Sequence, residues 1–207
     1  MEKKVYNAAE SSKFLKDYAS IPKFEVVNHV DEIKIKAPLV LKILSKDALH
    51  KTEINGVKIV PYNESVTSAF SDLMKEAQSH KIVPDGIFVQ EFVKGIESIV
   101  GIKKDPVFGH MILFGLGGVF TEVVADTSTR KCPITLEDAD EMISELKSSR
   151  VFHEFRGMKV DFNGLKKSLV RISELPLKHP EIEELDINPF TLTGKGSMAV
   201  DIRVISS

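Results

Sequence analysis

The chain has few features that would place it outside the cell or in a membrane. Its single cysteine, Cys132, excludes an internal disulfide and a cysteine-rich metal site. The longest near-apolar run, "MILFGLGGVF" at residues 111–120, is too short and too rich in glycine to span a bilayer. The N-terminal residues show no apolar segment of a signal peptide. We therefore expect a soluble cytoplasmic protein that makes no membrane contact.

The chain also lacks a large excess of either positive or negative charge. The 207 residues include 28 Lys and Arg and 30 Asp and Glu, which gives a net charge of −2 at pH 7. Domains that bind nucleic acid usually carry a strong basic excess, so we expect no nucleic-acid partner. A composition of 43% hydrophobic and 28% charged residues is typical of a soluble globular enzyme.

The hydrophobic pattern predicts strands and helices in two blocks that meet near residue 93. The expected strands cover residues 23–28, 37–45, 55–61, 86–93, 97–105, 110–115 and 119–126, with two more inside 181–205. The expected longer helices cover residues 63–80, about 135–148, and 162–174. This order favours an α+β fold with two lobes. We expect one domain over 1–207, with an N-terminal helix at 8–19, a small lobe at about 20–93 and a large lobe at about 94–207.

The closing segment, "EIEELDINPFTLTGKGSMAVDIRVI", is predicted to be a hairpin around Gly194 and Lys195. A two-residue turn with glycine first suits type II′ and would place Asn188 directly opposite Asp201. A three-residue loop would instead shift the register by one residue. In the two-residue register, Asp186 and Asn188 share one face of the hairpin with Asp201. The remaining side chains are expected on the other face: Leu185 and Ile187 in the first strand, and Met198, Val200 and Ile202 in the second.

These three polar side chains suit a magnesium site. Side chains directly opposite each other in an antiparallel pair have Cβ atoms about 5 Å apart, close enough for two oxygens to share one cation. Mg²⁺ prefers one or two protein oxygens together with waters and phosphate oxygens. Asp186, Asn188 and Asp201 are therefore candidate ligands of a Mg-nucleotide. The alternative is a polar hairpin face exposed to water.

A second group of candidates lies at residues 42–58, "KILSKDALHKTEINGVKI". Lys42 interrupts an apolar strand, so it either snorkels from a strand edge or reaches a buried anion. Gly56 would let the backbone approach a ligand, and Lys58 would add charge at a phosphate site. His50, inside this lysine-rich loop, is either a solvated loop residue or a group that handles phosphate. The glycine spacing of a Walker loop is absent.

The glycine-rich stretch "FGLGGVFTE" at residues 114–122 has two interpretations. It can expose successive backbone N–H groups as an anion-binding nest, or it can form a tight hairpin with a bulge. The pattern favours the bulge slightly.

Several of these stretches together resemble one family. "LVLKILSKDALHKTEINGVKI", "VQEFVKGIE", "DPVFGHMILFGLGGVFTEVVADTSTRKCPIT" and "EIEELDINPF" are similar to the nucleotide-binding β subunit of ADP-forming acetyl-CoA synthetases, which are related to succinate–CoA ligase. The resemblance covers about residues 9–205. It implies the ATP-grasp fold, in which the nucleotide lies between two lobes. One departure is the short "HVDEIKIK" segment, where the family usually has a helix of about ten residues or more.

The resemblance also implies roles for individual residues. Lys42 matches the lysine that contacts the nucleotide phosphates, and Glu97 matches the acid that binds the ribose. The segment from Gln90 to Val93 matches the part that meets adenine, with Glu91 and Val93 using backbone atoms. The candidate nucleotide-binding residues are therefore Lys42, Gly56, Lys58, Gln90, Glu91, Val93, Glu97, Gly117 and Gly118. The candidate metal ligands remain Asn188, Asp201 and Asp186, and the candidate catalytic residues are His50, Glu122 and Arg130.

The implied activity is that of an acetate–CoA ligase (ADP-forming), in which acyl-CoA, ADP and phosphate give acid, CoA and ATP. A CoA-binding α subunit would carry a first phosphohistidine, and His50 would relay its phosphoryl group to Mg-ADP. A separate partner is expected, because no CoA-binding domain is recognisable in these residues, and the resemblance implies an α2β2 heterotetramer. Two alternatives remain: another ATP-grasp carboxylate ligase without a histidine relay, and a non-catalytic nucleotide-sensing module.

Overall fold

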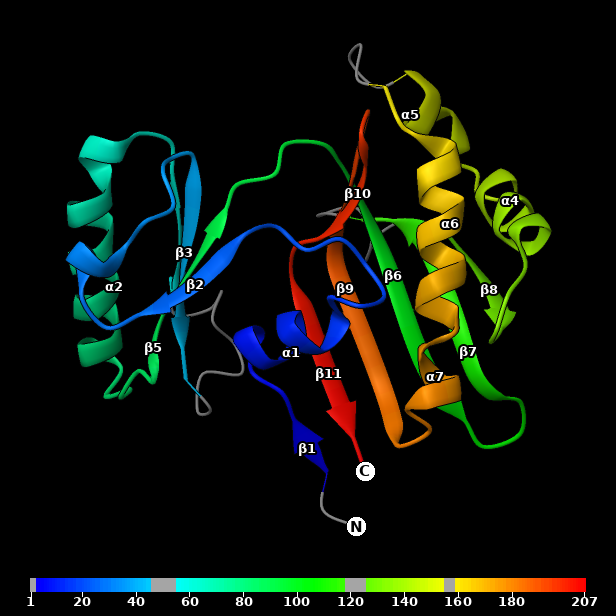
Figure 1. Cartoon of the computed structure of the whole chain (residues 1–207), viewed down its shortest axis with the longest axis horizontal. Coiled ribbons are helices and arrows are strands. Elements are labelled where there is room, and N and C mark those ends of the chain that lie inside the picture. The colour runs from blue at the N-terminus through cyan, green and yellow to red at the C-terminus, as the bar shows by residue number, and fades with distance from the viewer. Residues whose placement is uncertain (1–2, 46–54, 118–125, 155–158) are drawn as a thin grey trace. The chain divides into compact units, whose positions relative to one another are not determined.

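The computed structural model describes residues 3–45, 55–117, 126–154 and 159–207 (Figure 1). The chain forms two compact units that divide between Phe92 and Val93. The larger unit contains Met1–Tyr6, Ser11–Ile21 and Val93–Ser207, and the smaller unit contains Asn7–Glu10 and Pro22–Phe92. Helix α1 (Ala8–Leu15) therefore contributes residues to both units.

The smaller unit contains an antiparallel four-stranded sheet in the order β2-β5-β3-β4. Its strands are β2 (Phe24–Val27), β3 (Leu39–Leu44), β4 (Val57–Val60) and β5 (Gly86–Glu91). Helix α2 (Val66–Ser79) presents Phe70, Leu73 and Ala77 to one face of this sheet, as its helical spacing predicts. Two 3-10 turns, η1 (Val30–Glu32) and η2 (Asn63–Ser65), complete the unit. The short η1 turn is the only helix described between β2 and β3, where the family's longer helix was expected to be missing.

The other face of the small sheet carries a separate apolar group. Phe24 of β2 and Phe88 of β5 stack with their ring centroids 5.1 Å apart. Ala8, Ala9 and Leu44 pack with them. Strand β3 is therefore buried on both faces, which explains why its sequence is almost continuously apolar.

The larger unit contains an antiparallel seven-stranded sheet in the order β1-β11-β9-β6-β7-β8, with β10 paired to β9. Its strands are β1 (Lys4–Val5), β6 (Ile96–Asp105), β7 (Gly109–Leu116), β8 (Thr127–Lys131), β9 (Ile182–Thr193), β10 (Gly196–Ala199) and β11 (Ile202–Ser206). The helices are α4 (Leu136–Ser144), α5 (Ser149–Glu154), α6 (Phe162–Ser173) and α7 (Leu175–Lys178). Pairing of β1 with β11 brings the two ends of the chain together, as Figure 1 shows.

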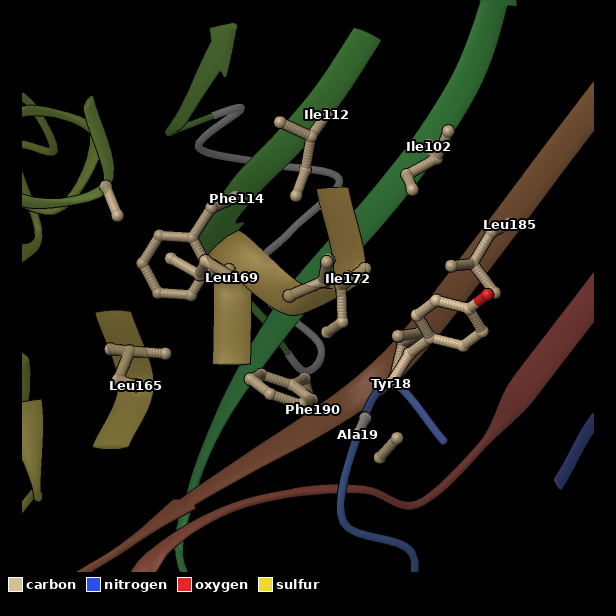
Figure 2. Close-up of a cluster of buried hydrophobic side chains, with 14 of the residues drawn as sticks. Tyr18, Ala19, Ile102, Ile112, Phe114, Leu165, Leu169, Ile172, Leu185 and Phe190 are labelled. Carbon is tan, nitrogen blue, oxygen red and sulfur yellow. The ribbon is translucent and has the colours of Figure 1, made fainter. Parts of the chain in front are cut away.

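One hydrophobic core lies between this sheet and its helices (Figure 2). Leu165, Leu169 and Ile172 recur at helical spacing on α6 and face Phe114 of β7 and Phe190 of β9. Tyr18 and Ala19, from the segment after α1, belong to the same core. The opposite face of the sheet carries half-buried and exposed side chains, both polar and apolar.

Most of the expected elements are present, and the differences are local. The expected strand at 119–126 lies almost entirely outside the described residues, whereas β8 at Thr127–Lys131 was not expected. Its sequence, TSTRK, has no apolar alternation because β8 is an exposed edge strand. The short elements β1, α5 and α7 were also not expected. Within the described residues, no helix is long and apolar enough to cross a membrane.

Candidate functional site

The closing hairpin has the predicted register. Thr193 pairs with Gly196 across the two-residue turn of Gly194 and Lys195. The same register continues into β11, where Asp186 pairs with Arg203. Asn188 lies opposite Asp201 between these pairs, and its backbone N–H donates to the Asp201 carbonyl at 3.0 Å. The predicted juxtaposition of Asn188 and Asp201 is therefore confirmed.

The predicted division of the apolar residues between the two faces is partly wrong. Leu185 and Ile187 are buried as expected, but Met198 and Val200 are only half-buried. Ser197 and Ala199 are buried in their place. The alternation of faces changes phase at Asn188–Pro189 in β9 and at the opposite Val200–Asp201, where β10 ends before β11 begins. Asp201 remains on the polar side, because the next residue, Ile202, points into the core.

Electrostatics make this polar face a favourable place for a cation. Burial raises the pKa of the Asp186 carboxyl, and the neighbouring Glu184 and Asp201 raise it further. Arg203, directly across from Asp186, opposes the shift. Glu184 and Asp201 both repel the charged form of the Asp186 carboxyl, and a divalent cation would relieve that repulsion.

The donor set fits Mg²⁺ better than a transition metal. Within the described residues, no group of three or more His, Cys, Asp or Glu side chains is arranged to hold a metal by itself. Mg²⁺ needs no such cage, since one or two carboxylates together with nucleotide phosphates and waters complete its shell. Asp201, Asp186 and the amide oxygen of Asn188 match that requirement.

Lys42 is buried in the smaller unit. Only 6% of the residue is exposed, and its Nζ lies 5.8 Å from the centroid of the Phe88 ring. Strand β3 has β5 on one side and β4 on the other, so snorkelling from a strand edge is excluded. A cation–π contact stabilises the ammonium group at this distance. Of the two interpretations of Lys42, the structure favours a buried group that can meet an anion.

The structure does not bring Lys58 together with Lys42. Lys58 pairs with Leu41, whereas Lys42 pairs with Val57 on β4 and with Phe88 on β5. Paired side chains share a face, so Lys58 starts from the face that packs against α2 and Lys42 from the opposite one. The predicted joint phosphate site of these two lysines is therefore wrong. Gly56 continues the sheet, since its carbonyl accepts from the Ile43 N–H at 2.9 Å.

The segment predicted to meet adenine ends β5. Gln90 is fully buried. The Glu91 N–H donates to the Lys23 carbonyl at 2.9 Å, and the Phe92 N–H donates to the Pro38 carbonyl at 3.0 Å. The next donor, the Val93 N–H, has no acceptor in the described part of the chain. Val93 is one of the two residues that are expected to meet the base through backbone atoms.

Glu97 and Gly117 meet through the backbone. The Gly117 N–H donates to the Glu97 carbonyl at 3.0 Å, so it is not available to bind an anion. A Cβ atom at Gly117 would lie 2.7 to 2.9 Å from three backbone atoms of Ser98. Gly117 therefore permits close strand packing, and its assignment to a phosphate nest is wrong. The Glu97 side chain is exposed and points away from the core, because Ile96 and Ser98 on either side are buried.

Arg130 lies on the other face of the large sheet. It pairs with the core residue Ile112, and its guanidinium donates to Glu145 at 3.1 Å and to Glu141 at 3.3 Å. Glu141 belongs to α4, and Glu145 is the first residue after the end of that helix. Arg130 is thus separated by the sheet from Asp186 and Asn188. Its position supports a role in holding α4 rather than in catalysis.

Three candidates fall outside the described residues: His50, Glu122 and Gly118. Their predicted roles remain predictions.

Gly101 was not expected to belong to the site. It lies in the middle of β6, pairs with Asp186 and Leu113, and faces the polar side. A Cβ atom there would meet only ordinary contacts, at 3.6 Å to the Leu185 carbonyl and 3.9 Å to Leu113. Packing therefore does not require this glycine, and a strand glycine without a packing reason often leaves room for a ligand. The sequence did contain a signal for Gly101, because it is an isolated glycine inside an otherwise regular strand pattern.

Comparison with known proteins identifies the family. An ATP-grasp domain model matches residues 2–205. Acetate–CoA ligase [ADP-forming] I subunit beta of Pyrococcus furiosus is 39% identical over 207 residues, covering 95% of this chain and 89% of that subunit. Acetate–CoA ligase [ADP-forming] I of Archaeoglobus fulgidus is 38% identical and is also matched over 95% of this chain. This chain spans only 30% of the length of the Archaeoglobus protein.

Solved structures agree with these relatives. Acetyl-coenzyme A synthetase 1 of Ca. Korarchaeum cryptofilum, in complex with coenzyme A and Ca-AMPCP, matches with a TM-score of 0.93 at 34% identity. The match covers 99% of this chain and 94% of that chain. A second structure of that protein holds coenzyme A and Mg-AMPPCP, with a phosphohistidine segment pointing towards the nucleotide-binding site. It has a TM-score of 0.87 at 33% identity, and the match covers 99% of this chain and 93% of that chain. The chain belongs to the ATP-grasp family, in the branch of the ADP-forming acyl-CoA synthetase β subunits.

Proposed function

We propose that this chain is the nucleotide-binding β subunit of an ADP-forming acetate–CoA ligase. In the proposed reaction, acetyl-CoA, ADP and phosphate give acetate, CoA and ATP, and the reaction is reversible. This chain binds the nucleotide and receives the phosphoryl group. A separate CoA-binding α subunit forms the acyl phosphate and carries the first phosphohistidine, and the two subunits assemble as α2β2.

The observation that carries the proposal is the register of the β9–β10–β11 hairpin. Asn188 lies opposite Asp201 in this register, and Asp186, whose carboxyl pKa is raised, precedes Asn188 by two residues in the same strand. When bound, Mg²⁺ offsets the negative charge of the nucleotide phosphates. The side chains of this face provide its protein oxygens and keep the cation at a fixed position on a rigid sheet.

The nucleotide itself is held by side chains and backbone groups. Lys42 provides positive charge for the phosphates from a buried strand, where its ammonium is screened less by water than at the surface. Gln90, the Glu91 carbonyl and the Val93 N–H meet the adenine. Glu97 accepts hydrogen bonds from the ribose hydroxyls.

His50 is proposed to carry the phosphoryl group between the subunits. The imidazole accepts the phosphoryl group from the partner's phosphohistidine and releases it to the terminal phosphate oxygen of ADP. The lysines beside it in the sequence, Lys46 and Lys51, offset the charge that spreads over the phosphoryl oxygens in each transfer. The phosphohistidine segment of the Korarchaeum relative supports a histidine-based transfer.

The metal site is tested by nucleotide binding. Asn188→Ala with Asp201→Ala should abolish Mg-dependent ADP binding in calorimetry while the circular dichroism spectrum stays unchanged. Glu183→Gln is the matched control, because it removes a negative charge from the same strand, and Glu183 is paired with Lys104 rather than acting on Asp186. Unchanged Mg-ADP affinity in the double variant would remove the hairpin from the site.

The relay is tested on the assembled complex. His50→Ala should stop ATP formation from acetyl-CoA, ADP and phosphate, while the partner's histidine still takes up ³²P. The loss should exceed the ~2.7–4 kcal/mol typical of deleting one electrostatic donor, because a covalent carrier is removed. ATP synthesis near the wild-type rate would contradict the relay. ATP synthesis by the isolated wild-type chain would contradict the need for a partner.

A further inference from the structure

One arginine lies beside the predicted metal ligands on strand β11. Arg203 follows Asp201 by two residues, and its neighbours Ile202 and Val204 are buried in the core. Arg203 itself is exposed, so its side chain projects from the face of the large sheet that carries Asn188 and Asp201. Two residues along a strand span about 7 Å, which places Arg203 next to the metal ligands.

Arg203 belongs to a row of three paired residues across the sheet. Strands β11, β9 and β6 lie side by side in that order (Figure 1). Arg203 on β11 pairs with Asp186 on β9, and Asp186 pairs with Gly101 on β6. Because Gly101 has no side chain and packing does not require the glycine, this row has room for a ligand above the sheet.

The guanidinium of Arg203 is not engaged by another side chain in the part of the chain that the structure describes. Its charge acts on the Asp186 carboxyl, but no ion pair of 4 Å or less joins the two side chains. Arg130 and Arg171, by contrast, are both held, the first by Glu145 at 3.1 Å and the second by the Asp17 carbonyl at 2.7 Å. An arginine that serves as a structural counter-ion normally forms short, often bidentate hydrogen bonds to its carboxylate. Arg203 does not, so its donors can bind a ligand.

The order of the site residues along β9 indicates which part of the nucleotide Arg203 meets. Glu97, the residue proposed to bind the ribose, pairs with Thr191 on β9. Asn188 precedes Thr191 in that strand, and Asp186 precedes Asn188. A nucleotide with its ribose at Glu97 and its metal-bound phosphates at Asn188 therefore continues towards Asp186 and Arg203. The group at that end is the terminal phosphate.

The charge on this face also calls for a further cation. The two positive charges of Mg²⁺ are balanced by the carboxylates of Asp186 and Asp201, so the ion alone does not offset the charge of the phosphates. A guanidinium is always charged and presents planar N–H donors that match the oxygens of a phosphoryl group.

We propose that Arg203 binds the phosphoryl group that ADP receives, which is the terminal phosphate of ATP. The inference rests on the proposed function, which places Mg-nucleotide on this face. It adds no covalent step, because the guanidinium only donates hydrogen bonds to the phosphoryl oxygens. A counter-ion of Asp186 would instead act on every nucleotide that shares the metal ion.

The test compares the affinities of the full chain for Mg-ATP and Mg-ADP in calorimetry. Arg203→Gln should weaken Mg-ATP binding about 10–100-fold, the effect of losing a charge-assisted hydrogen bond, and should change Mg-ADP binding by less than about twofold. Arg203→Lys keeps the charge without the planar donors, so its Mg-ATP affinity should lie between those of wild type and Arg203→Gln. Lys103→Gln is the matched control, because it removes the same charge from the same face one row further from Asn188, opposite Glu184. It should leave both affinities unchanged.

The possible results separate the inference from the proposed function. An equal loss of affinity for both nucleotides in Arg203→Gln would identify a counter-ion that acts through the metal, and it would overturn the inference. Unchanged Mg-ATP affinity, or an equal loss in Lys103→Gln, would overturn it as well. Because Arg203 and Lys103 are exposed, all three variants should keep the wild-type unfolding midpoint. A wild-type chain that binds neither nucleotide overturns the proposed function, and this inference with it.

Discussion

Replacing Gly117 by alanine separates two roles for the glycine-rich segment. A Cβ atom at Gly117 would lie 2.7 Å from the C, 2.8 Å from the O and 2.9 Å from the Cα atom of Ser98. Neither the backbone at Gly117 nor that at Ser98 in β6 can easily move apart to make room. The Gly117 N–H is bonded to the Glu97 carbonyl at 3.0 Å, and the Ser98 hydroxyl donates to the Phe190 carbonyl at 2.6 Å.

The expected cost follows from this overlap. Inserting a methyl group into a well-packed region typically costs about 1–3 kcal/mol. We expect Gly117→Ala to lose about 2–3 kcal/mol, because all three contacts are backbone atoms rather than flexible side chains. Total stabilities are about 5–15 kcal/mol, so the change is a large fraction of the whole.

Gly101→Ala is the matched control for stability alone, since the contacts of its added Cβ atom are ordinary. Removing a glycine from a strand interior should stabilise the fold by about 0.5–1 kcal/mol. Urea unfolding followed by circular dichroism measures both variants, and ADP calorimetry accompanies it. Unchanged stability of Gly117→Ala with weakened nucleotide binding would refute the packing argument and restore the anion-binding role.

Three further predictions concern single groups. Arg130→Gln should lower the free energy of unfolding by about 1 kcal/mol, because the ion pairs with α4 are lost, while the ADP affinity stays unchanged. Normal stability together with lost phosphoryl transfer would instead support a catalytic role for Arg130. Burial raises the pKa of the Cys132 thiol to about 12, so alkylation at pH 8 should be about a thousandfold slower than for a thiol of pKa 9.0, and fast labelling by iodoacetamide would contradict this. Hydrogen bonds from the Phe108 and Val107 N–H groups lower the pKa of Asp105, so its stabilisation of the turn between β6 and β7 is complete above the ordinary value of 3.8 and is lost as the pH falls through the lowered pKa. Exchange protection of those two amides should fall in that acidic range, and Asp105→Asn should remove this pH dependence.

The parts of the fold that follow from local patterns could be predicted. The Gly194–Lys195 turn between two alternating strands fixes the register, and with it the juxtaposition of Asn188 and Asp201. The helical spacing of Phe70, Leu73 and Ala77 likewise identifies α2 and its buried face.

The errors concern features that depend on distant residues. Whether Lys58 shares a face with Lys42 depends on the register of β3 and β4, which are well separated in the sequence, and one residue of difference reverses the face. The acidic partners of Arg130 lie 11 and 15 positions later in the chain, so the sequence did not reveal its contact with α4, and its catalytic role stays a prediction. At Asn188–Pro189 the alternation of buried and exposed side chains in β9 changes phase. This change depends on the pairing of β9 with both β11 and β6, so the sequence of β9 alone does not reveal it.

The assembly of the larger unit from three stretches of chain has a consequence for folding. Residues 22–92 of the smaller unit are contiguous and leave the ribosome together, so that unit can fold early. The larger unit cannot be completed until the last strand is made, because Lys4 pairs with Ser206 and Leu15 lies in the same core as Val204. Contacts of such high sequence separation are slow to form, since a long loop must close first. Until β1 and α1 pack onto the finished sheet, the edge of β11 and part of the core remain exposed. The N-terminal segment is therefore made first but is the last part of this unit to reach its partners.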